Sequence, residues 1–161
     1  MHVSRAPLLL LAACGTEAPP ASPCGPSVAM VDRVIDGDTI VLTSGEKVRY
    51  LLINANEITN GHDECYGHEA ADYNTMLVGG QQVSLVYDQQ CTDIFGRLLA
   101  YVSVSGREVN PLLVERGYAC VLYIPPDGAS RHVEFQNLEL EARAAKVGMW
   151  GACPEVPCAS K

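Results

Sequence analysis

Short runs of β-branched residues, separated by turn signals, dominate the first third of this chain. Between Val28 and Ile53 the runs are interrupted by Asp36-Gly37 and Ser44-Gly45, dipeptides that commonly join neighbouring antiparallel strands. This pattern predicts a three-stranded meander. Alternating or continuous apolar residues predict further strands over 83–87, 98–104 and 119–122.

Apolar residues at helical spacing follow in three segments, 66–78, 110–117 and 130–146. Gly79-Gly80 supplies a stop for the first helix. We expect Asn110 to cap the second, because Asn accepts hydrogen bonds from free N–H groups and Pro111 has no N–H to lose. Strands that come first, with helices interleaved later, predict an α+β domain with a small closed sheet.

Composition limits the number of domains and the kind of surface. The chain has 161 residues, of which 48% are hydrophobic and 19% charged, so one domain with a real core is expected. Nineteen acidic against 11 basic residues give a net charge of −8. That balance argues against a broad basic surface for nucleic acid. No apolar run approaches the roughly 18–20 residues of a membrane-spanning helix.

The N-terminal sequence suggests export and lipid attachment. An apolar run follows Arg5, and Leu11-Ala12-Ala13-Cys14-Gly15 resembles a bacterial lipobox. Lipidation of Cys14 would anchor the chain to a membrane outside the cytoplasm. The alternatives are a soluble secreted form and an uncleaved N-terminus. We divide the chain into a signal peptide (1–13), a lipidated tether rich in Pro, Ala and Ser (14–27), a folded domain (28–152) and a C-terminal tail with cysteines (153–161).

Several motifs of the folded domain match one family. The main ones are Val-Ile-Asp-Gly-Asp-Thr-Ile at 34–40, Val-Arg-Tyr-Leu-Leu-Ile at 48–53, Glu57, and Asp-Ile-Phe-Gly-Arg-Leu-Leu-Ala-Tyr-Val at 93–102. In order and in approximate spacing, from residue 28 to residue 150, the chain resembles the staphylococcal nuclease (thermonuclease) family. The resemblance implies a five-stranded oligonucleotide/oligosaccharide-binding (OB) barrel with about three helices, in agreement with the pattern above.

The resemblance also implies calcium-dependent hydrolysis of DNA and RNA. Arg49, Glu57 and Arg97 match the family's catalytic residues, and Asp38 matches a calcium ligand. A carboxylate such as Glu57 can act as general base toward water. The forked donors of two guanidinium groups can neutralise charge that develops on phosphoryl oxygens. Ca²⁺ prefers carboxylate and carbonyl oxygens of the kind found here.

Several positions depart from the family pattern, among them Ala55-Asn56, which stand where the family usually has a small residue and a proline before Glu57. Asn54 stands where the family usually has a metal-ligating Asp; its amide oxygen is a possible ligand, but one negative charge is lost, so calcium affinity is expected to fall. Ile94 and Phe95 replace groups that bind a terminal phosphate. Substrate binding would then depend on the arginines and on stacking by Tyr123, which matches a base-stacking tyrosine, and by Phe95.

Two functions compete on this sequence. The first is a monomeric extracytoplasmic nuclease acting on single-stranded DNA or RNA, either as a cell-envelope lipoprotein or in secreted form. The alternative is a catalytically impaired OB-fold module that binds nucleic acid or another surface ligand, which the change at Asn54 favours. A purely structural envelope protein has only the Pro-rich tether in its support.

Six cysteines remain after Cys14, and an even number in an exported domain predicts three disulfides. Six cysteines allow 15 pairings. We favour Cys65 with Cys91, because both flank the expected site, and the others pairing among themselves. His62, Cys65 and His68 could alternatively be zinc ligands, although the oxidising compartment makes disulfides the better interpretation. The disulfide candidates are Cys24, Cys65, Cys91, Cys120, Cys153 and Cys158.

Overall fold

The computed structural model describes residues 22–160. Its first three strands form the expected antiparallel meander: β1 (Val28–Asp36), β2 (Thr39–Leu42) and β3 (Lys47–Tyr50). The turn between β1 and β2 requires a glycine, because a Cβ atom at Gly37 would lie 2.6 Å from the Cβ of Ala55 and 2.7 Å from that of Ala70. The tight turn therefore also allows helix α1 (Gly67–Val78) to pack closely against the barrel.

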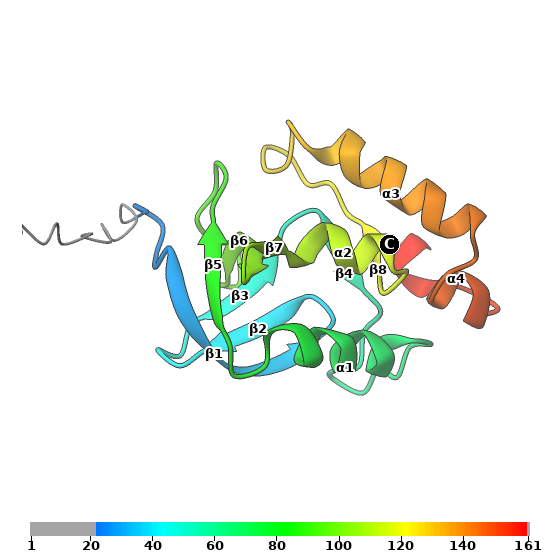
Figure 1. Cartoon of the computed structure of the whole chain (residues 1–161), viewed down its shortest axis with the longest axis horizontal. Coiled ribbons are helices and arrows are strands. Elements are labelled where there is room, and N and C mark those ends of the chain that lie inside the picture. Colours follow the sequence, from blue (N-terminus) through cyan, green and yellow to red (C-terminus); the bar gives the residue numbers. More distant parts are fainter. Residues whose placement is uncertain (1–21, 161) are drawn as a thin grey trace, which may run out of the picture.

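Five strands close into a barrel (Figure 1). β5 (Gln82–Val86) pairs with β1, and β6 (Leu98–Val104) pairs with β5. A parallel pairing of β3 with β6, in which Val48 lies opposite Leu98, completes the closure. The short β7 (Arg107–Glu108) pairs antiparallel with the end of β6, and β4 (Ile53–Ala55) pairs with β8 (Ala119–Val121) in a separate ribbon. The expected five-stranded barrel is confirmed.

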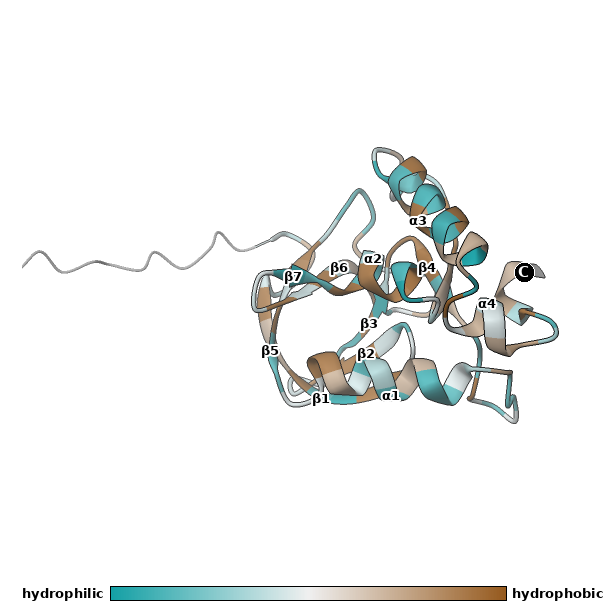
Figure 2. Ribbon diagram, turned by 45° about the vertical axis from the view of Figure 1, so that its right-hand side comes forward, coloured by the Kyte–Doolittle hydropathy of each residue, from teal (hydrophilic) through white to brown (hydrophobic). Residues whose placement is uncertain are grey.

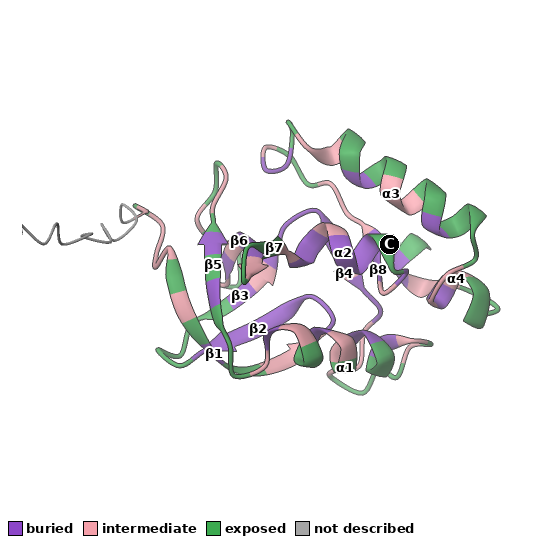
Figure 3. Ribbon diagram, viewed as in Figure 1, coloured by how far each residue is buried: buried purple, intermediate pink, exposed green. Residues whose placement is uncertain are grey.

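Three main helices cover the barrel, as expected. α1 packs against β1, α2 (Val109–Glu115) against β6, and α3 (His132–Ala144) against α2. Two short elements that the sequence pattern did not predict follow: α4 (Met149–Ala152) and a 3₁₀ helix at Pro157–Ser160. The outer face of α3 is hydrophilic in Figure 2 and exposed in Figure 3, whereas its buried Phe135 belongs to the core.

The prediction that Asn110 caps α2 is wrong. The helix begins one residue earlier, at Val109, and the fully buried Asn110 side chain bonds to other elements instead. Its Oδ1 accepts a hydrogen bond from Val102 N (2.9 Å), and its Nδ2 donates to the carbonyl oxygens of Leu51 (3.0 Å) and Ala100 (3.3 Å). Asn110 thus joins α2, β6 and the end of β3, because burial leaves a polar amide no water to bond with.

We expect the substitution Asn110→Ala to destabilise the fold by about 3 kcal/mol, because it removes the side-chain hydrogen bonds to Val102 N and Leu51 O in the core and one of the two that Ala100 O accepts. Chemical denaturation measures the change. Asn137, exposed on α3, provides the control: Asn137→Ala should shift the free energy of unfolding by no more than about 0.5 kcal/mol. Equal stability of the two variants would contradict the role assigned to Asn110.

Three disulfides form, but with a different pairing from the one favoured above. The pairs are Cys24–Cys91, Cys65–Cys153 and Cys120–Cys158. The predicted Cys65–Cys91 pair is wrong, because Cys91 lies beside the N-terminal residue Cys24. Cys65 is bonded to Cys153, so the alternative of a zinc site with His62 and His68 also fails. The C-terminal residues are fastened to the domain at two points, and Cys158 is buried.

The proposed signal peptide and the lipid-bearing Cys14 lie outside the described residues. Among the residues that the structure does describe, there is no helix with the length and apolar character needed to cross a membrane.

Candidate active site

A cavity of about 680 Å³ opens beside the β1–β2 turn, the end of β3 and the strand β4. The loops that precede β6 and follow β8 form its other walls. It gathers chemistry-bearing residues from four separate parts of the sequence. The charged and amide side chains that line it include Asp36, Asp38, Arg49, Asn54, Glu57, Asp93, Arg97 and Asp127.

Asp38 and Arg49 form a nearly buried ion pair at the base of this cavity. Asp38 Oδ2 lies 3.2 Å from Arg49 Nη2 and accepts a hydrogen bond from Ala55 N (2.7 Å). Asp38 Oδ1 accepts one from the Thr39 hydroxyl (2.9 Å). The Asp38 carboxylate is therefore held rigidly between β2 and β4.

The Arg49 guanidinium is fixed by four oxygen atoms. Nη1 donates to the carbonyl oxygens of Tyr50 and Ile53, both at 2.7 Å, and Nη2 donates to Asn54 Oδ1 (3.1 Å) as well as facing Asp38. Because these contacts come from the end of β3, from β4 and from Asp38 just before β2, the local fold orients the guanidinium before any substrate arrives. Arg49 is thus a preorganised cation, and the carboxylate of Asp38 partly neutralises its charge.

Asp36 lies two residues before Asp38 and is electrostatically crowded. Burial, and then the neighbouring Asp38 carboxylate, raise the pKa of Asp36 to about 7, although Arg49 opposes the shift. Two carboxylates in one partly desolvated corner repel each other, and an added cation would relieve that repulsion.

The oxygen donors of this corner match the preferences of a hard divalent cation. Asp36 and Asp38 supply carboxylates and Asn54 supplies an amide oxygen on the same cavity, and calcium takes such ligands. Among residues 22–160 no group of three or more His, Cys, Asp or Glu side chains is arranged to hold a metal. The donor types therefore fit calcium, with little negative charge to bind it tightly.

Glu57 follows β4 and its carboxylate is oriented by its own loop. Glu57 Oε1 accepts hydrogen bonds from Ile58 N (3.1 Å), Thr59 N (2.8 Å) and the Thr59 hydroxyl (2.5 Å). The backbone is closed in a ring, because Glu57 N donates to Glu64 Oε2 (2.7 Å) and Glu64 N donates to Glu57 O (2.9 Å). The loop from 57 to 64 therefore fixes both the backbone and the carboxylate of Glu57.

Arg97 is presented by the tight turn before β6. Its Nε donates to Asp93 Oδ2 (2.7 Å), and its backbone N and that of Phe95 donate to Asp93 Oδ1. Partial burial raises the pKa of Asp93, but these hydrogen bonds and the charge of Arg97 outweigh it and hold the pKa below its usual value. Asp93 therefore stays charged and orients Arg97 through Nε.

The rim of the cavity is apolar. Ile94 is 93% exposed and Phe95 77% exposed, and Ile124 also projects into solvent. The Arg97 guanidinium lies 5.5 Å from the centre of the Phe95 ring. A base placed on this ring would lie beside the cation that faces a phosphate, an arrangement typical of single-strand binding sites.

Tyr123 does not line the cavity; its ring stacks on His132, with centroids 4.5 Å apart. Base stacking by Tyr123 stays a prediction. Sequence reasoning overlooked Asp127, whose buried Oδ1 accepts hydrogen bonds from Gln89 N (2.8 Å) and Gln90 N (2.9 Å) and so joins two cavity loops. The sequence identified Asn56 only as a departure from the family pattern and assigned it no role; it is considered below.

Residues 47–152 match the staphylococcal nuclease homologue family. This region exceeds half of the chain, and the chain belongs to that family. The match includes Arg49, Asn54, Glu57 and Arg97 and begins after Asp36 and Asp38. The resemblance inferred from the motifs is therefore confirmed.

Several named relatives agree with this assignment. Endonuclease YncB of Bacillus subtilis (strain 168) is 39% identical over 127 residues, which cover 74% of this chain and 60% of that protein. SPbeta prophage-derived endonuclease YokF of the same organism is 37% identical over 127 residues, covering 74% of this chain and 43% of that protein. The thermonuclease of Staphylococcus intermedius is 31% identical over 126 residues, covering 75% and 74%. The chain thus spans less than two thirds of the length of the two Bacillus relatives.

Proposed function

We propose that this chain is a nuclease that hydrolyses phosphodiester bonds of single-stranded DNA or RNA. The observation that carries the proposal is the single cavity into which Glu57, Arg49 and Arg97 project together with the oxygens of Asp38 and Asn54. Family membership, with relatives named as endonucleases and a thermonuclease, supports the same reaction class.

In this proposal Glu57 removes a proton from the attacking water. A general base must be held in place while it accepts the proton, and the hydrogen bonds to Glu57 Oε1 from residues 58 and 59 restrict its rotation. The water oxygen then attacks phosphorus, and the bond to the leaving oxygen breaks as negative charge builds on the phosphoryl oxygens.

The two arginines stabilise that charge. Asp93 holds the Arg97 guanidinium through its Nε atom. This one hydrogen bond sets the orientation of the planar group. A guanidinium placed in this way can donate paired hydrogen bonds to phosphoryl oxygens. Arg49 contributes a nearly buried positive charge that needs little reorganisation during the reaction.

Calcium, held by Asp38 and Asn54, would supply further positive charge at the phosphate and orient water. Because only one of these two ligands is anionic, its affinity should be lower than at a site with two aspartates.

The three disulfides favour an oxidising compartment, and so support action outside the cytoplasm. With the lipobox-like sequence at Cys14, they make a membrane-anchored or secreted monomer the form we propose. The apolar rim of Ile94, Phe95 and Ile124 suits exposed bases, which a duplex would keep stacked inside.

One observation favours the second function, a binding module that has lost catalysis. The Arg49 guanidinium already bonds with Asp38, Asn54 and two carbonyl oxygens, so a weakly bound cation must compete with it for the same oxygens. If that competition fails at every calcium concentration, the cavity would bind nucleic acid without cleaving it.

Restoring the negative charge at position 54 separates the two functions. We expect the natural chain to cleave single-stranded DNA with calcium, and the Asn54→Asp variant to need about tenfold less calcium for half-maximal rate, because a carboxylate binds calcium better than an amide. A calcium titration of the initial rate measures this. Cleavage by the variant alone, with none by the natural chain, would make the binding module the better assignment.

A further inference from the structure

Asn56 is a polar residue buried between the site and the C-terminal segment. Its side chain is 1% exposed, and it lies directly before Glu57 and two residues after Asn54. Its Nδ2 donates to the carbonyl oxygen of Cys65 and lies 3.8 Å from Met149 Sδ; its Oδ1 accepts a hydrogen bond from Cys158 N (2.9 Å). One side chain therefore connects Cys65, just before α1, with two points of a C-terminal segment that lies 93 to 102 residues further along the chain.

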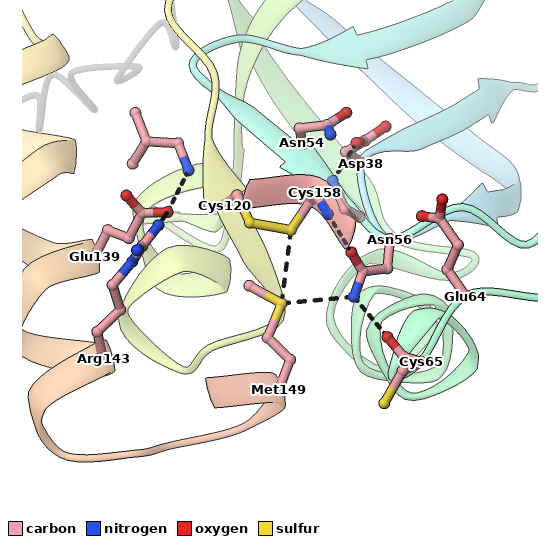
Figure 4. The surroundings of a disulfide bond; sticks show 12 residues. Asp38, Asn54, Asn56, Glu64, Cys65, Cys120, Glu139, Arg143, Met149 and Cys158 are labelled. Carbon is pink, nitrogen blue, oxygen red and sulfur yellow. Dashed lines mark hydrogen bonds and ion pairs between the residues drawn. A yellow bond between two sulfur atoms is a disulfide. The ribbon is translucent and has the colours of Figure 1, made fainter. Parts of the chain in front are cut away.

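Two of these partners are themselves held by disulfides. Cys65 is bonded to Cys153, and Figure 4 shows Cys158 bonded to Cys120. Cys120 lies opposite Asn54 in the β4–β8 ribbon. Two disulfides thus attach the segment from Met149 to Cys158 to the site. Cys153 is bonded to Cys65, at the end of the loop that follows Glu57, and Cys158 is bonded to the strand that pairs with Asn54. The amide of Asn56 lies between these two attachments.

The backbone at Asn56 has little room to move independently of α1. A Cβ atom at Gly67, the first residue of α1, would lie 3.0 Å from Asn56 O. The next residue, Glu57, is held on its other side by the reciprocal bonds with Glu64. Glu57 is therefore held on one side by the contacts of Asn56 and on the other by its two hydrogen bonds with Glu64.

We infer that Asn56 is a positioning residue for hydrolysis: the C-terminal segment acts through its buried amide to fix Asn54 and Glu57. The inference rests on the proposed nuclease function for its kinetic consequence, but not for its structural one. Losing the amide frees the chain between β4 and α1, and displacement of a catalytic group by about 1 Å can cost up to about a hundredfold in rate.

The first test compares Asn56→Ala with a destabilising variant elsewhere in the core. Val78 is fully buried at the opposite end of α1, about 17 Å along a helix of 12 residues. Both variants should lose stability. We expect Asn56→Ala to lower kcat by about tenfold or more with KM within about twofold, and Val78→Ala to leave both unchanged at a temperature where both are folded. Equal kcat values in the two variants would overturn the inference.

A second test changes the C-terminal partner of Asn56 instead of Asn56 itself. The double substitution Cys120→Ala/Cys158→Ala releases the C-terminal 3₁₀ helix, whose Cys158 N–H donates to Asn56 Oδ1, and it serves alone if Asn56→Ala does not fold. Because both changes break one connection, we expect their effects on kcat to be less than multiplicative when combined. Fully multiplicative losses would show that Asn56 and the C-terminal segment act independently, and would overturn the proposal.

Amide hydrogen exchange supplies a readout that does not depend on activity. In NMR experiments the Glu57 N–H, which is bonded to Glu64, should exchange at least about tenfold faster in Asn56→Ala than in Val78→Ala. If the natural chain shows no hydrolysis, the proposed function fails while this difference still supports positioning by Asn56. Equal exchange in the two variants contradicts it whatever the activity.

Discussion

Replacing Arg97 with alanine is expected to lower the rate of phosphodiester cleavage by about 10³-fold. Arg97 lines the cavity and is oriented by Asp93 through Nε, so its loss removes a fixed cation from the site where charge develops. The fold should survive, because the Arg97–Asp93 pair is partly exposed and Asp93 keeps its hydrogen bonds from the backbone of Phe95 and residue 97. Single-turnover cleavage of a labelled oligonucleotide measures the loss.

An arginine outside the cavity provides the matched control. Arg107 is exposed on β7, and Arg107→Ala makes the same change in net charge. Its cleavage rate should stay within about twofold of the natural chain, because a screened surface charge adds little to a local reaction. Comparable losses in the two variants would mean that general attraction of the substrate, and not a placed guanidinium, accounts for the effect of Arg97.

The substitution Glu57→Gln is the second change with a very large expected effect, a fall of about 10³-fold in kcat. Glutamine has nearly the same shape and can still accept the hydrogen bonds from residues 58 and 59, but it cannot take a proton from water. Circular dichroism should therefore show an unchanged fold, and the measurement is the maximal rate at saturating substrate and calcium.

Glu141 offers the control for this change. It is exposed on α3, and Glu141→Gln should leave kcat unchanged. If Glu57→Gln keeps more than about a tenth of the natural rate, another group accepts the proton, and the role given to Glu57 is wrong.

The parts of the fold that the sequence predicted well are those controlled by local signals. The turn dipeptides at 36–37 and 44–45 mark the meander: β1 ends at the first turn, β2 lies between the two turns, and β3 follows the second. Gly79-Gly80 follows the end of α1 at Val78. These signals act through the backbone of a few neighbouring residues, so their effect is visible without the tertiary structure.

The sequence-based predictions were wrong where a side chain bonds to residues that are distant in the sequence. The sequence Asn110-Pro111 is typical of a helix start, yet Asn110 serves β6 and the end of β3, because the barrel places unbonded backbone groups beside it. The disulfides join cysteines 67, 88 and 38 residues apart. Such pairings depend on which ends of the chain meet in space, which no local pattern specifies.

The sequence predicted those residues of the candidate site that belong to recognisable motifs. The residues from four of those motifs, Asp38, Arg49, Glu57 and Arg97, line one cavity. Tyr123 stacks on His132 instead of lining that cavity, because the helix α3 begins at His132 and presents its ring. Asn56 carried one local signal, a polar residue immediately before the expected base, but its importance depends on a C-terminal segment about a hundred residues away, as the Asn56–Cys158 bond with its separation of 102 shows.

The most direct test of the nuclease proposal is cleavage by the natural chain itself. The oxidised protein, purified from a host that lacks contaminating nucleases, would be incubated with single-stranded DNA and RNA in calcium or in chelator, beside Arg97→Ala as a blank. We predict cleavage that requires calcium and disappears in the variant. A folded protein that cleaves neither substrate at any calcium concentration, or whose cleavage persists undiminished in Arg97→Ala, would contradict the proposal.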